Sequence, residues 1–328
     1  MTIVVCGSLN MDVVARSPRL PQPGETLIGT QFETIPGGKG ANQAVAIGKL
    51  GLPVALIGRV GADDFGQGLL AALTRSQVKA DGVYVDPQAH TGMAVITVDD
   101  QGENTIIVVP GANAQLGEAD LQRLQMCLQT SLQAGRDRDL VNLLLLQLEI
   151  PLPIVTQAAQ LAQAAGFTVI LDPAPAQSDL PADLYAATDI LTPNQVEAEQ
   201  LTGIAITDVD RAAQAGQQLR DRGCDQVLVK LGAGGVVVCT AIGTTHVPAY
   251  PVQAVDTVAA GDAFNGGLAV ALAQGQELTA AVVDASAVAA LSVTRPGAQS
   301  SLPTASEVAA FLALGRTVST MPRYKSVI

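Results

Sequence analysis

Short apolar runs alternate with longer helical stretches along most of this chain, and no other feature of the sequence constrains its fold as strongly. The runs are rich in Val, Ile and Leu, as buried parallel strands are. They read TIVVCGSLN, VALIGRVG, VNLLLLQLE, FTVILDPAP, TDILTPN and QVLVKLG. The stretches between them, such as PIVTQAAQLAQAAG, are rich in Ala and Gln and end in glycine, as helices often do. The pattern predicts an α/β fold with a Rossmann-like, mostly parallel sheet and helices on both faces.

Two segments interrupt this alternation and predict a separate small sheet. DVVARSPRLPQPGETLIGTQFETIPGG and GMAVITVDDQGENTIIVVPGAN contain alternating β-branched residues and turn sequences, without an intervening helix. We expect them to form an antiparallel β lid, from about 12–36 and 91–110, over the edge where the main strands end. Residues 1–315 are expected to form a single domain, and the non-periodic residues 316–328 a C-terminal tail.

Composition restricts the partners. The chain of 328 residues carries a formal net charge of -12, and its Lys and Arg residues form no basic cluster. Nucleic acids and anionic membranes bind concentrated positive charge, so we expect neither as a partner. The uncharged stretch 150–171 contains prolines and glutamines that disfavour a membrane span. Small-molecule chemistry is the remaining expectation.

The four cysteines indicate a reducing compartment. They form no C-x-x-C motif, and the chain has only two histidines to complete a zinc site. The start, MTIVVCGSLNMD, lacks the basic region of a signal peptide. We therefore expect free thiols and a cytoplasmic protein.

Polar residues follow the predicted strands where each one ends. The carboxyl ends of parallel strands share one edge, where ligands bind in open α/β sheets, so we expect these side chains to converge. They are Asn10, Asp12, Asp63, Asp64, Glu149, Asp172, Asn194 and Lys230. Glu149 ends a run of leucines, and a carboxylate in that position needs polar partners.

The stretch DTVAAGDAFNGG predicts a helix start that can hold an anion. Helical periodicity begins at about Ala260, which leaves the four amides of 259–262 free. Small side chains let a phosphate approach these amides, and the helix dipole favours negative charge there. In the alternative interpretation, Asp262 is a first-turn acid that only complements the dipole.

Two glycine-rich segments also have both a structural and a functional interpretation. KLGAGG, residues 230–235, either closes a tight hairpin or lets a nucleotide approach the backbone. In IPGGKGANQ, the glycines either form a hinge before a helix or let Lys39 and Asn42 lie close to a polyol or sugar.

TPNQVEAEQLTG likewise allows two interpretations, which can both hold. Asn194 and Glu197 have the spacing of a helix N-cap and its capping-box partner. The same carboxylate and amide can hold a hydrated Mg²⁺, which needs few protein ligands.

Taken together, these motifs resemble those of the ribokinase-like (PfkB) carbohydrate kinases. The family's order and approximate spacing are kept, from about Ile3 to Pro303, by GSLNMD, GGKGANQA, QLE, DPAPA, TPNQVEAEQLTG, LVKLGAGG, AVDTVAAGDAFNG and VTRPGAQSSLP. Neither GxxxxGK[ST] nor GxGxxG is present, which excludes a Walker A loop and a dinucleotide fingerprint. The residues near 130–141 and the C-terminal tail depart from the family pattern.

The resemblance implies ATP-dependent phosphorylation of a sugar, most specifically of D-ribose at O5. Asp262 would be the base that takes the proton from the sugar hydroxyl. The anion hole for the transferring phosphoryl group would be formed by Ala259, Ala260 and Gly261. The sugar contacts would come from Asn10, Asp12, Gly38, Lys39, Asn42, Glu149 and Asp262.

The resemblance also implies a nucleotide site and two metal ions. ATP would be held by Asn194, Lys230, Gly232, Gly234, Gly235 and Gly261, and Glu197 would help to position Mg²⁺. K⁺ would lie beside the anion hole, with ligands from Asp256, Val258, Ser292, Arg295, Gly297 and Ser301. Lys230 stands where relatives often have a hydroxyl residue.

Other functions stay open from the sequence. A fructokinase or an adenosine kinase would use the same chemistry, although the low aromatic content, 3%, disfavours nucleoside stacking. A non-catalytic sugar-binding protein would keep the pocket without needing a base at Asp262. A Rossmann-type oxidoreductase fits the composition but needs the missing glycine fingerprint. The exposed surface of a β lid invites pairing with a second copy, and the resemblance implies a homodimer through the lid.

Overall fold

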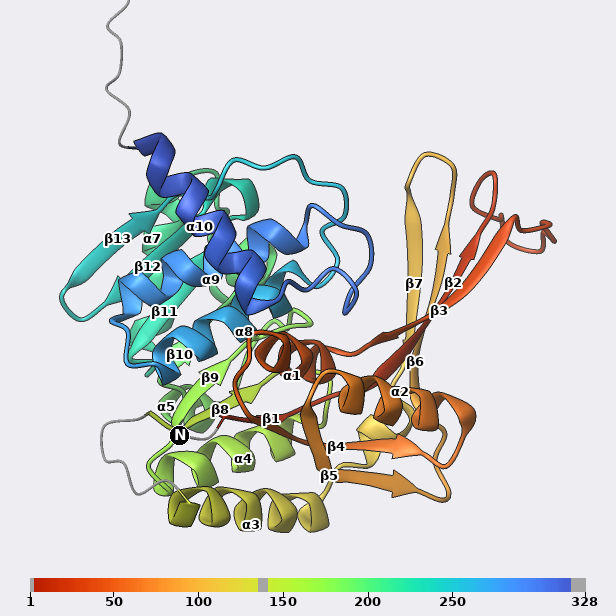
Figure 1. Cartoon of the computed structure of the whole chain (residues 1–328), viewed down its shortest axis with the longest axis horizontal. Coiled ribbons are helices and arrows are strands. Elements are labelled where there is room, and N and C mark those ends of the chain that lie inside the picture. Colours follow the sequence, from red (N-terminus) through yellow and green to blue (C-terminus); the bar gives the residue numbers. More distant parts are fainter. Residues whose placement is uncertain (1–2, 135–140, 320–328) are drawn as a thin grey trace, which may run out of the picture.

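A nine-stranded sheet forms the centre of the molecule (Figure 1), in a computed structural model that describes residues 3–134 and 141–319. The strand order is β13-β12-β11-β10-β9-β8-β1-β4-β5. Neighbouring strands from β11 to β5 are parallel, and β12 and β13 extend the sheet as an antiparallel edge. The strands are β1 (Ile3–Cys6), β4 (Val54–Gly61), β5 (Val78–Asp86), β8 (Leu143–Leu146), β9 (Thr168–Leu171), β10 (Ile190–Leu191), β11 (Gln226–Lys230), β12 (Val236–Thr240) and β13 (Gly243–Val247).

Every apolar run predicted as a strand is one, so the predicted mostly parallel sheet is confirmed. The sequence analysis did not identify β5, β12 and β13. The residues of β5 are half polar and those of β13 are mostly exposed, so neither carries the apolar pattern of a central strand.

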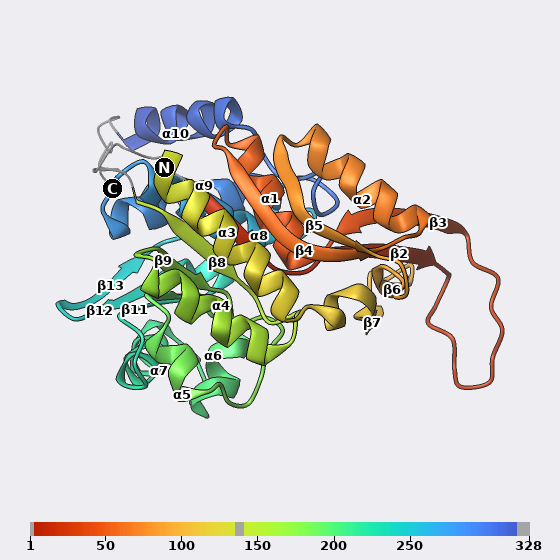
Figure 2. The same ribbon diagram turned by 90° about the horizontal axis from the view of Figure 1, so that it is seen from below.

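Helices cover both faces of the sheet, as Figure 2 shows. Successive strand residues point to opposite faces, so Val4 and Cys6 pack into one core layer while Ile3 and Val5 pack into the other. The layer on Ile3 and Val5 contains α1 (Lys39–Lys49), α2 (Asp64–Arg75), α8 (Ala260–Ala273), α9 (Leu278–Ser292) and α10 (Ala305–Ser319). The opposite layer contains α3 (Glu118–Ala134), α4 (Leu152–Ala164), α5 (Ala182–Ala186), α6 (Gln195–Thr202) and α7 (Val209–Asp221).

A smaller sheet of four strands projects from the main body (Figure 1) and corresponds to the predicted lid. Its order is β3-β2-β6-β7, with β2 (Asn10–Arg16), β3 (Gln31–Gly37), β6 (Gly92–Val98) and β7 (Asn104–Val109). The outer pairs are antiparallel as expected, but the central pair, β2 and β6, is parallel. The reason is topological, because β2 follows β1 and β6 follows β5, and both leave the same edge of the parallel sheet.

The C-terminal tail and the residues near 130–141, which depart from the family pattern in sequence, are only partly described by the structure. Helix α10 continues to Ser319, past the position 315 at which the domain was expected to end, and the remainder of the tail lies outside the described residues. Of the residues near 130–141, those up to Ala134 belong to α3, and 135–140 also lie outside the described part. In the described ranges, no helix has the length and hydropathy needed to cross a membrane.

Close packing of α1 on α8 sets the geometry of the polar edge. A Cβ atom added to Gly266 of α8 would lie 2.5 Å from the Cβ of Ala46 and 3.3 Å from the carbonyl oxygen of Gln43, both on α1. A Cβ on Gly40 would lie 2.6 Å from the backbone of Gly7, at the end of β1. Glycine at these two positions therefore brings α1 against both α8 and the main sheet.

Candidate active site

The first turn of α8 has an unusual backbone. Ala259, the N-cap residue, has φ of +59°, a left-handed conformation that is rare for alanine, and its side chain cannot cap the helix. Such strain costs of order 1–3 kcal/mol and is characteristic of ligand-binding turns. The amide of Ala260 makes one long hydrogen bond, 3.3 Å to the carbonyl of Thr257. The predicted helix start is confirmed, and it provides amides that a small anion can reach.

Asp262 lies in this turn and is only 4% exposed. Its Oδ2 accepts a hydrogen bond from Asn42 Nδ2 at 3.0 Å, and its Oδ1 accepts one from Gln43 Nε2 at 3.1 Å. Burial raises the pKa of Asp262 to about 6, against the opposing effects of Lys39 and the two amide hydrogen bonds. The carboxylate is thus charged at neutral pH and is close to the basicity that suits a general base. A first-turn acid that served only the helix dipole would not need these buried partners.

Glu149 holds together three segments at the base of the lid. Its Oε2 accepts hydrogen bonds from the hydroxyl of Ser8, from Asn10 Nδ2 at 3.4 Å and from the backbone amide of Lys39 at 3.1 Å. Asn10 is fixed in turn by Asn113, whose Nδ2 donates to Asn10 Oδ1 at 2.7 Å. These contacts supply the polar partners that the sequence analysis required for Glu149.

Asp12 stands on the lid strand β2 above this group. A Cβ on Gly37 of the paired strand β3 would lie 2.7 Å from Asp12 Oδ2, so a side chain there would displace the Asp12 carboxylate from this position. Burial, together with the negative charges of Glu149 and Asp262, raises the pKa of Asp12 to about 7. Gly38 follows with φ of +88°, and its missing side chain lets the start of α1 approach Asn10.

Lys39 is the cation around which several acids converge. Burial lowers the pKa of its ammonium group, but the surrounding carboxylates outweigh burial and raise the pKa above its ordinary value. The carboxylates are Asp262, Asp172, Glu149 and Glu197. Glu149 and Asp172 follow different strands, as the sequence predicted, whereas Asp262 and Glu197 lie in the first turns of α8 and α6. Asp63 and Asp64 take no such part, because Asp63 caps α2 and accepts hydrogen bonds from Thr91, whereas Asp64 is exposed.

Asn194 and Glu197 form the predicted capping box at the start of α6. The backbone amide and the Nδ2 of Asn194 each lie 2.7 Å from one carboxylate oxygen of Glu197, and Glu197 N donates to Asn194 Oδ1 at 2.9 Å. Burial and nearby Asp172 raise the pKa of Glu197, although Lys230 and Lys39 oppose this. The structural interpretation of this motif is confirmed, and the carboxylate remains in a strongly charged environment.

The glycine-rich turn after β11 also has the structure predicted by its hairpin interpretation. Gly232–Gly234 form a single 3₁₀ turn between β11 and the antiparallel β12. A side chain on Gly235, at φ of +89°, would collide with the carbonyl of Val247, so the hairpin itself requires this glycine. Gly232 differs, since a Cβ there would meet no atom within 4 Å, and its backbone is open to an approaching molecule.

Lys230, at the end of β11, points toward the start of α8. Its Nζ donates to Asp172 Oδ1 at 3.0 Å and lies 3.5 Å from the position that a Cβ on Gly261 would occupy. Asp172 Oδ2 accepts a hydrogen bond from Gln43 Nε2 at 3.2 Å. The two sides of the site, Lys230 and Asp262, are therefore connected through Asp172 and Gln43.

The two loops predicted to bind K⁺ lie side by side. Asp256 Oδ1 accepts from the amide of Val258 at 3.0 Å, and its Oδ2 accepts from the amide of Gly297 at 2.8 Å. Val293 O accepts from the amides of Val255 and Asp256. Ser292 and Ser301 are buried, but their hydroxyls donate to carbonyl groups of their own segments, and the Arg295 guanidinium pairs with Glu307. The arrangement leaves backbone carbonyls and one carboxylate as possible ligands.

The sequence analysis missed several residues of the site. Gln43 and Gln147 form a buried amide pair behind Asp262, in which Gln147 Nε2 donates to Gln43 Oε1 at 2.7 Å. Asn113 anchors Asn10, and Asp172 was noted only as a strand-end acid. Gln43 directly follows Asn42 in GGKGANQA, so motif position was the one available signal. Its partners are 104 and 219 residues away in the chain, which no local pattern reveals.

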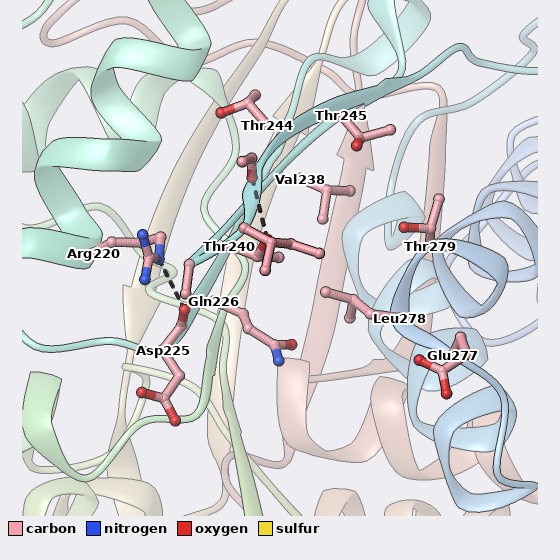
Figure 3. Close-up of a pocket in the computed structure, with 13 residues that line it drawn as sticks. Arg220, Asp225, Gln226, Val238, Thr240, Thr244, Thr245, Glu277, Leu278 and Thr279 are labelled. Carbon is pink, nitrogen blue, oxygen red and sulfur yellow. Dashed lines mark hydrogen bonds between the residues drawn. The ribbon is translucent and has the colours of Figure 1, made fainter.

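A cavity of about 570 Å³ lies elsewhere, between the β12–β13 hairpin and the start of α9 (Figure 3). Asp225 and Gln226, at the amino end of β11, contribute to its lining, whereas Lys230 is at the opposite end of the same strand. Ligands in open α/β sheets bind at the carboxyl ends of the strands, and the acids described above meet there. The cavity in Figure 3 is therefore separate from the candidate active site.

Comparison with known proteins gives a consistent result over nearly the whole chain. The model of the pfkB family of carbohydrate kinases matches residues 1–305. A ribokinase of Haemophilus influenzae is 40% identical over 311 residues, which cover 95% of this chain and 98% of the relative. A deoxyribokinase of Salmonella typhi is 35% identical over 314 residues, covering 96% and 99%. The structure of an Arabidopsis thaliana ribokinase complexed with ribose and ATP superposes with a TM-score of 0.85 at 34% identity, covering 94% and 98%.

The buried charge of Asp262 predicts a pH-dependent cost in stability. Its folded-state pKa of about 6 exceeds the ordinary value of 3.8, so ionisation opposes folding as pH rises between these values. We expect Asp262→Asn to increase the free energy of unfolding by about 3 kcal/mol at pH 7.5 and by about half as much at pH 5. Urea unfolding at both pH values measures the difference. A gain that is equal at the two pH values would contradict a raised pKa.

Proposed function

This chain belongs to the pfkB family of carbohydrate kinases, and on that premise we propose that it is an ATP-dependent kinase that phosphorylates D-ribose at O5, giving ribose 5-phosphate. The observation that carries the proposal is Asp262, a buried carboxylate held by Asn42 and Gln43 within the first turn of α8. The first turn of α8 thus brings a candidate base and an anion-binding helix start together.

In the proposed reaction, Asp262 accepts the proton of the sugar's primary hydroxyl. The sugar oxygen bonds to the γ-phosphorus of ATP, the bond from phosphorus to the bridging oxygen breaks, and its electron pair leaves with ADP. The amides of Ala259, Ala260 and Gly261 stabilise the charge on the transferring group. Phosphoryl transfer depends on positioning and charge neutralisation more than on covalent chemistry. A base and an anion hole, together with the metal ion of ATP, are therefore the kinds of group that the reaction needs.

The sugar is held at the base of the lid. Asn10, Lys39 and Glu149 already form one hydrogen-bonded group, and Asp12 lies above it on β2. Asn42 supports this placement, because its Oδ1 is buried and has no hydrogen-bond partner among the described residues. Gly38 lets the backbone approach the ligand. Closure of the lid excludes water, which would otherwise compete as phosphoryl acceptor.

The nucleotide lies along the ends of β10 and β11. Asn194 and the backbone of Gly232, Gly234 and Gly235 contact it, and its phosphates extend past Lys230 toward Gly261. Glu197 fits a hydrated Mg²⁺, because its buried carboxylate is fixed by Asn194 and keeps lone pairs for water ligands. When bound, Mg²⁺ neutralises charge on the ATP phosphates.

Ribose is favoured over the other acceptors on two grounds. The relatives with the highest identities described above act, by name, on ribose or deoxyribose. A nucleoside would need aromatic stacking, yet Phe32, the aromatic side chain of the first lid segment, is 68% exposed. The free thiols of all four cysteines agree with the proposed cytoplasmic location.

The activity is tested by ADP release with MgATP and K⁺ across D-ribose, 2-deoxyribose, fructose and adenosine. We expect D-ribose to give the highest kcat/KM, and Asp262→Asn to lower kcat by about 10²–10⁴-fold because the base is lost. Asp208→Asn, at the N-cap of α7 on another part of the surface, is the matched control and keeps full activity. A preference for another acceptor would keep the kinase mechanism but change the assigned substrate. The absence of turnover with any of the four acceptors would favour a sugar-binding protein.

We also propose that K⁺ binds between the loops 256–258 and 292–301 and activates the enzyme. Asp256 and the carbonyls of Val258, Ser292, Arg295 and Gly297, with Ser301, supply the hard oxygen ligands that such a cation prefers. The loop of Asp256 leads directly into Ala259, so an ordered cation site stabilises the anion hole. We expect activity to fall several-fold when K⁺ is replaced by tetramethylammonium. Equal rates in the two salts would exclude this site as an activator.

The lid is proposed to pair two copies of the chain. Its apolar side chains are exposed to an extent that a stable monomer would avoid, and they are Phe32, Val95, Ile106, Ile107 and Val108. Light scattering with size exclusion is expected to give a homodimer at micromolar concentration, and Ile107→Lys to shift it toward monomer. Ile242→Lys, on a fully exposed isoleucine of the β12–β13 turn, is the control and leaves the dimer intact. A wild-type monomer would refute the pairing.

A further inference from the structure

Lys230 and Asp172 form a buried ion pair, and they come from the strands on either side of β10. Lys230 ends β11, Asp172 directly follows β9, and the short strand β10 lies between them. Their side chains are 12% and 4% exposed, and Nζ lies 3.0 Å from Oδ1. Removing both charges from water is costly, and a buried pair is weak evidence for a purely stabilising role.

The location of the ammonium group points to the transferred phosphoryl group. Nζ lies 3.5 Å from the position of a Cβ on Gly261, which places it beside the strained turn at Ala259. An ammonium group has three donors, and its hydrogen bond to Asp172 uses one. An anion bound at the start of α8 therefore comes within reach of a preorganised cation.

Asp172 also connects this cation to the base. Its Oδ2 accepts from Gln43 Nε2, the same nitrogen that donates to Asp262 Oδ1. Gln147 fixes the other end of the Gln43 amide through Oε1. The orientation of Gln43 is thus determined on both sides, and it holds Asp262 at a fixed separation from the Lys230–Asp172 pair.

We propose that Lys230 is a catalytic residue that donates to the transferring γ-phosphoryl group, and that Asp172 is a positioning residue that aims Lys230 and, through Gln43, the base. The inference rests on the proposed kinase function and assigns Lys230 to the γ-phosphoryl group rather than to the rest of the nucleotide. Lys230 contributes charge at the moment when negative charge accumulates on the phosphoryl oxygens, whereas the proton still moves from the sugar hydroxyl to Asp262.

Nucleotide affinity tests the first half of the proposal without requiring turnover. We expect Lys230→Met to weaken binding of the non-hydrolysable β,γ-imido analogue of ATP by about 10–100-fold, as expected for a lost hydrogen bond to a charged group. ADP has no γ-phosphoryl group, so its affinity is expected to change little. Titration calorimetry with Mg²⁺ compares the two ligands, and equal losses for both would overturn the assignment.

Kinetics test the same residue in the reaction. We expect Lys230→Met to lower kcat by about 10²–10³-fold, the range for loss of one oxyanion-stabilising donor, with partial rescue by Lys230→Arg. Lys79→Met, on an exposed lysine of β5, makes the same change in charge and is expected to keep kcat. A kcat for Lys230→Met within threefold of wild type would overturn the catalytic role.

Asp172→Asn tests positioning through the pH profile. Asp262 is faced by Lys39 and the amide donors of α1, by Asp172 after β9 and by Asp12 on β2. Removal of the Asp172 charge lowers the pKa of Asp262, so the acidic limb of kcat/KM is expected to move to lower pH. An unchanged acidic limb would refute the connection to the base.

The double variant, Lys230→Met with Asp172→Asn, separates the proposal from misfolding. It removes both charges, so neither is left buried without its partner. Because Asp172 acts on kcat partly through Lys230 and partly through Gln43, the loss of kcat in the double variant is expected to be smaller, by at least about threefold, than the product of the two single losses. Fully multiplicative losses would show that Asp172 does not position Lys230. If wild type phosphorylates no sugar, the kinase function fails, while the comparison of ADP with the ATP analogue still decides the role of Lys230.

Discussion

The contact between α1 and α8 is the constraint on which the rest of the site depends. Two helices separated by more than two hundred residues of sequence approach closely enough for Asn42 and Gln43 to donate to the carboxylate of Asp262. The approach requires small residues, because a side chain at Gly266 would push α8 away from Ala46. Packing in the core thereby fixes the position of the Asp262 carboxylate, with no need for a flexible loop to place it.

Charge balance at the strand ends follows from this arrangement. The parallel strands β8 and β9 lead to Glu149 and Asp172, and the first turn of α8 adds Asp262 at the same edge, where mutual repulsion would be large in a buried setting. Lys39 at the start of α1 and Lys230 at the end of β11 lie among them and offset it. The balance is incomplete on the lid side, where burial and neighbouring acids raise the pKa of Asp12. The site thus retains electrostatic strain on the lid side, which hydroxyl groups of a ligand can relieve by donating hydrogen bonds to the carboxylates.

The sequence predicted the sheet and most site residues because both have local signals. A strand such as LLLL that is followed closely by Glu149, or a capping box such as that of Asn194 and Glu197, is recognisable from neighbouring residues alone. Contacts between distant segments have no such signal. The role of Gln43 depends on Gln147, Asp172 and Asp262, which three different elements supply. The parallel pairing of β2 with β6 was missed for a related reason, since pairing direction is set by where each strand leaves the main sheet.

The site also concentrates the unfavourable features of the fold. Ala259 has a left-handed backbone, Asp262 is a buried carboxylate, and Asn42 Oδ1 is buried without a partner among the described residues. Each feature costs folding free energy, and they persist because the surrounding helices and strands leave no room for relaxation. All three lie together where the first turn of α8 meets α1, the place of the proposed sugar and phosphate sites. In the proposed kinase, polar groups held in place by the core need not reorganise when charge develops in the reaction, which is what electrostatic preorganisation means.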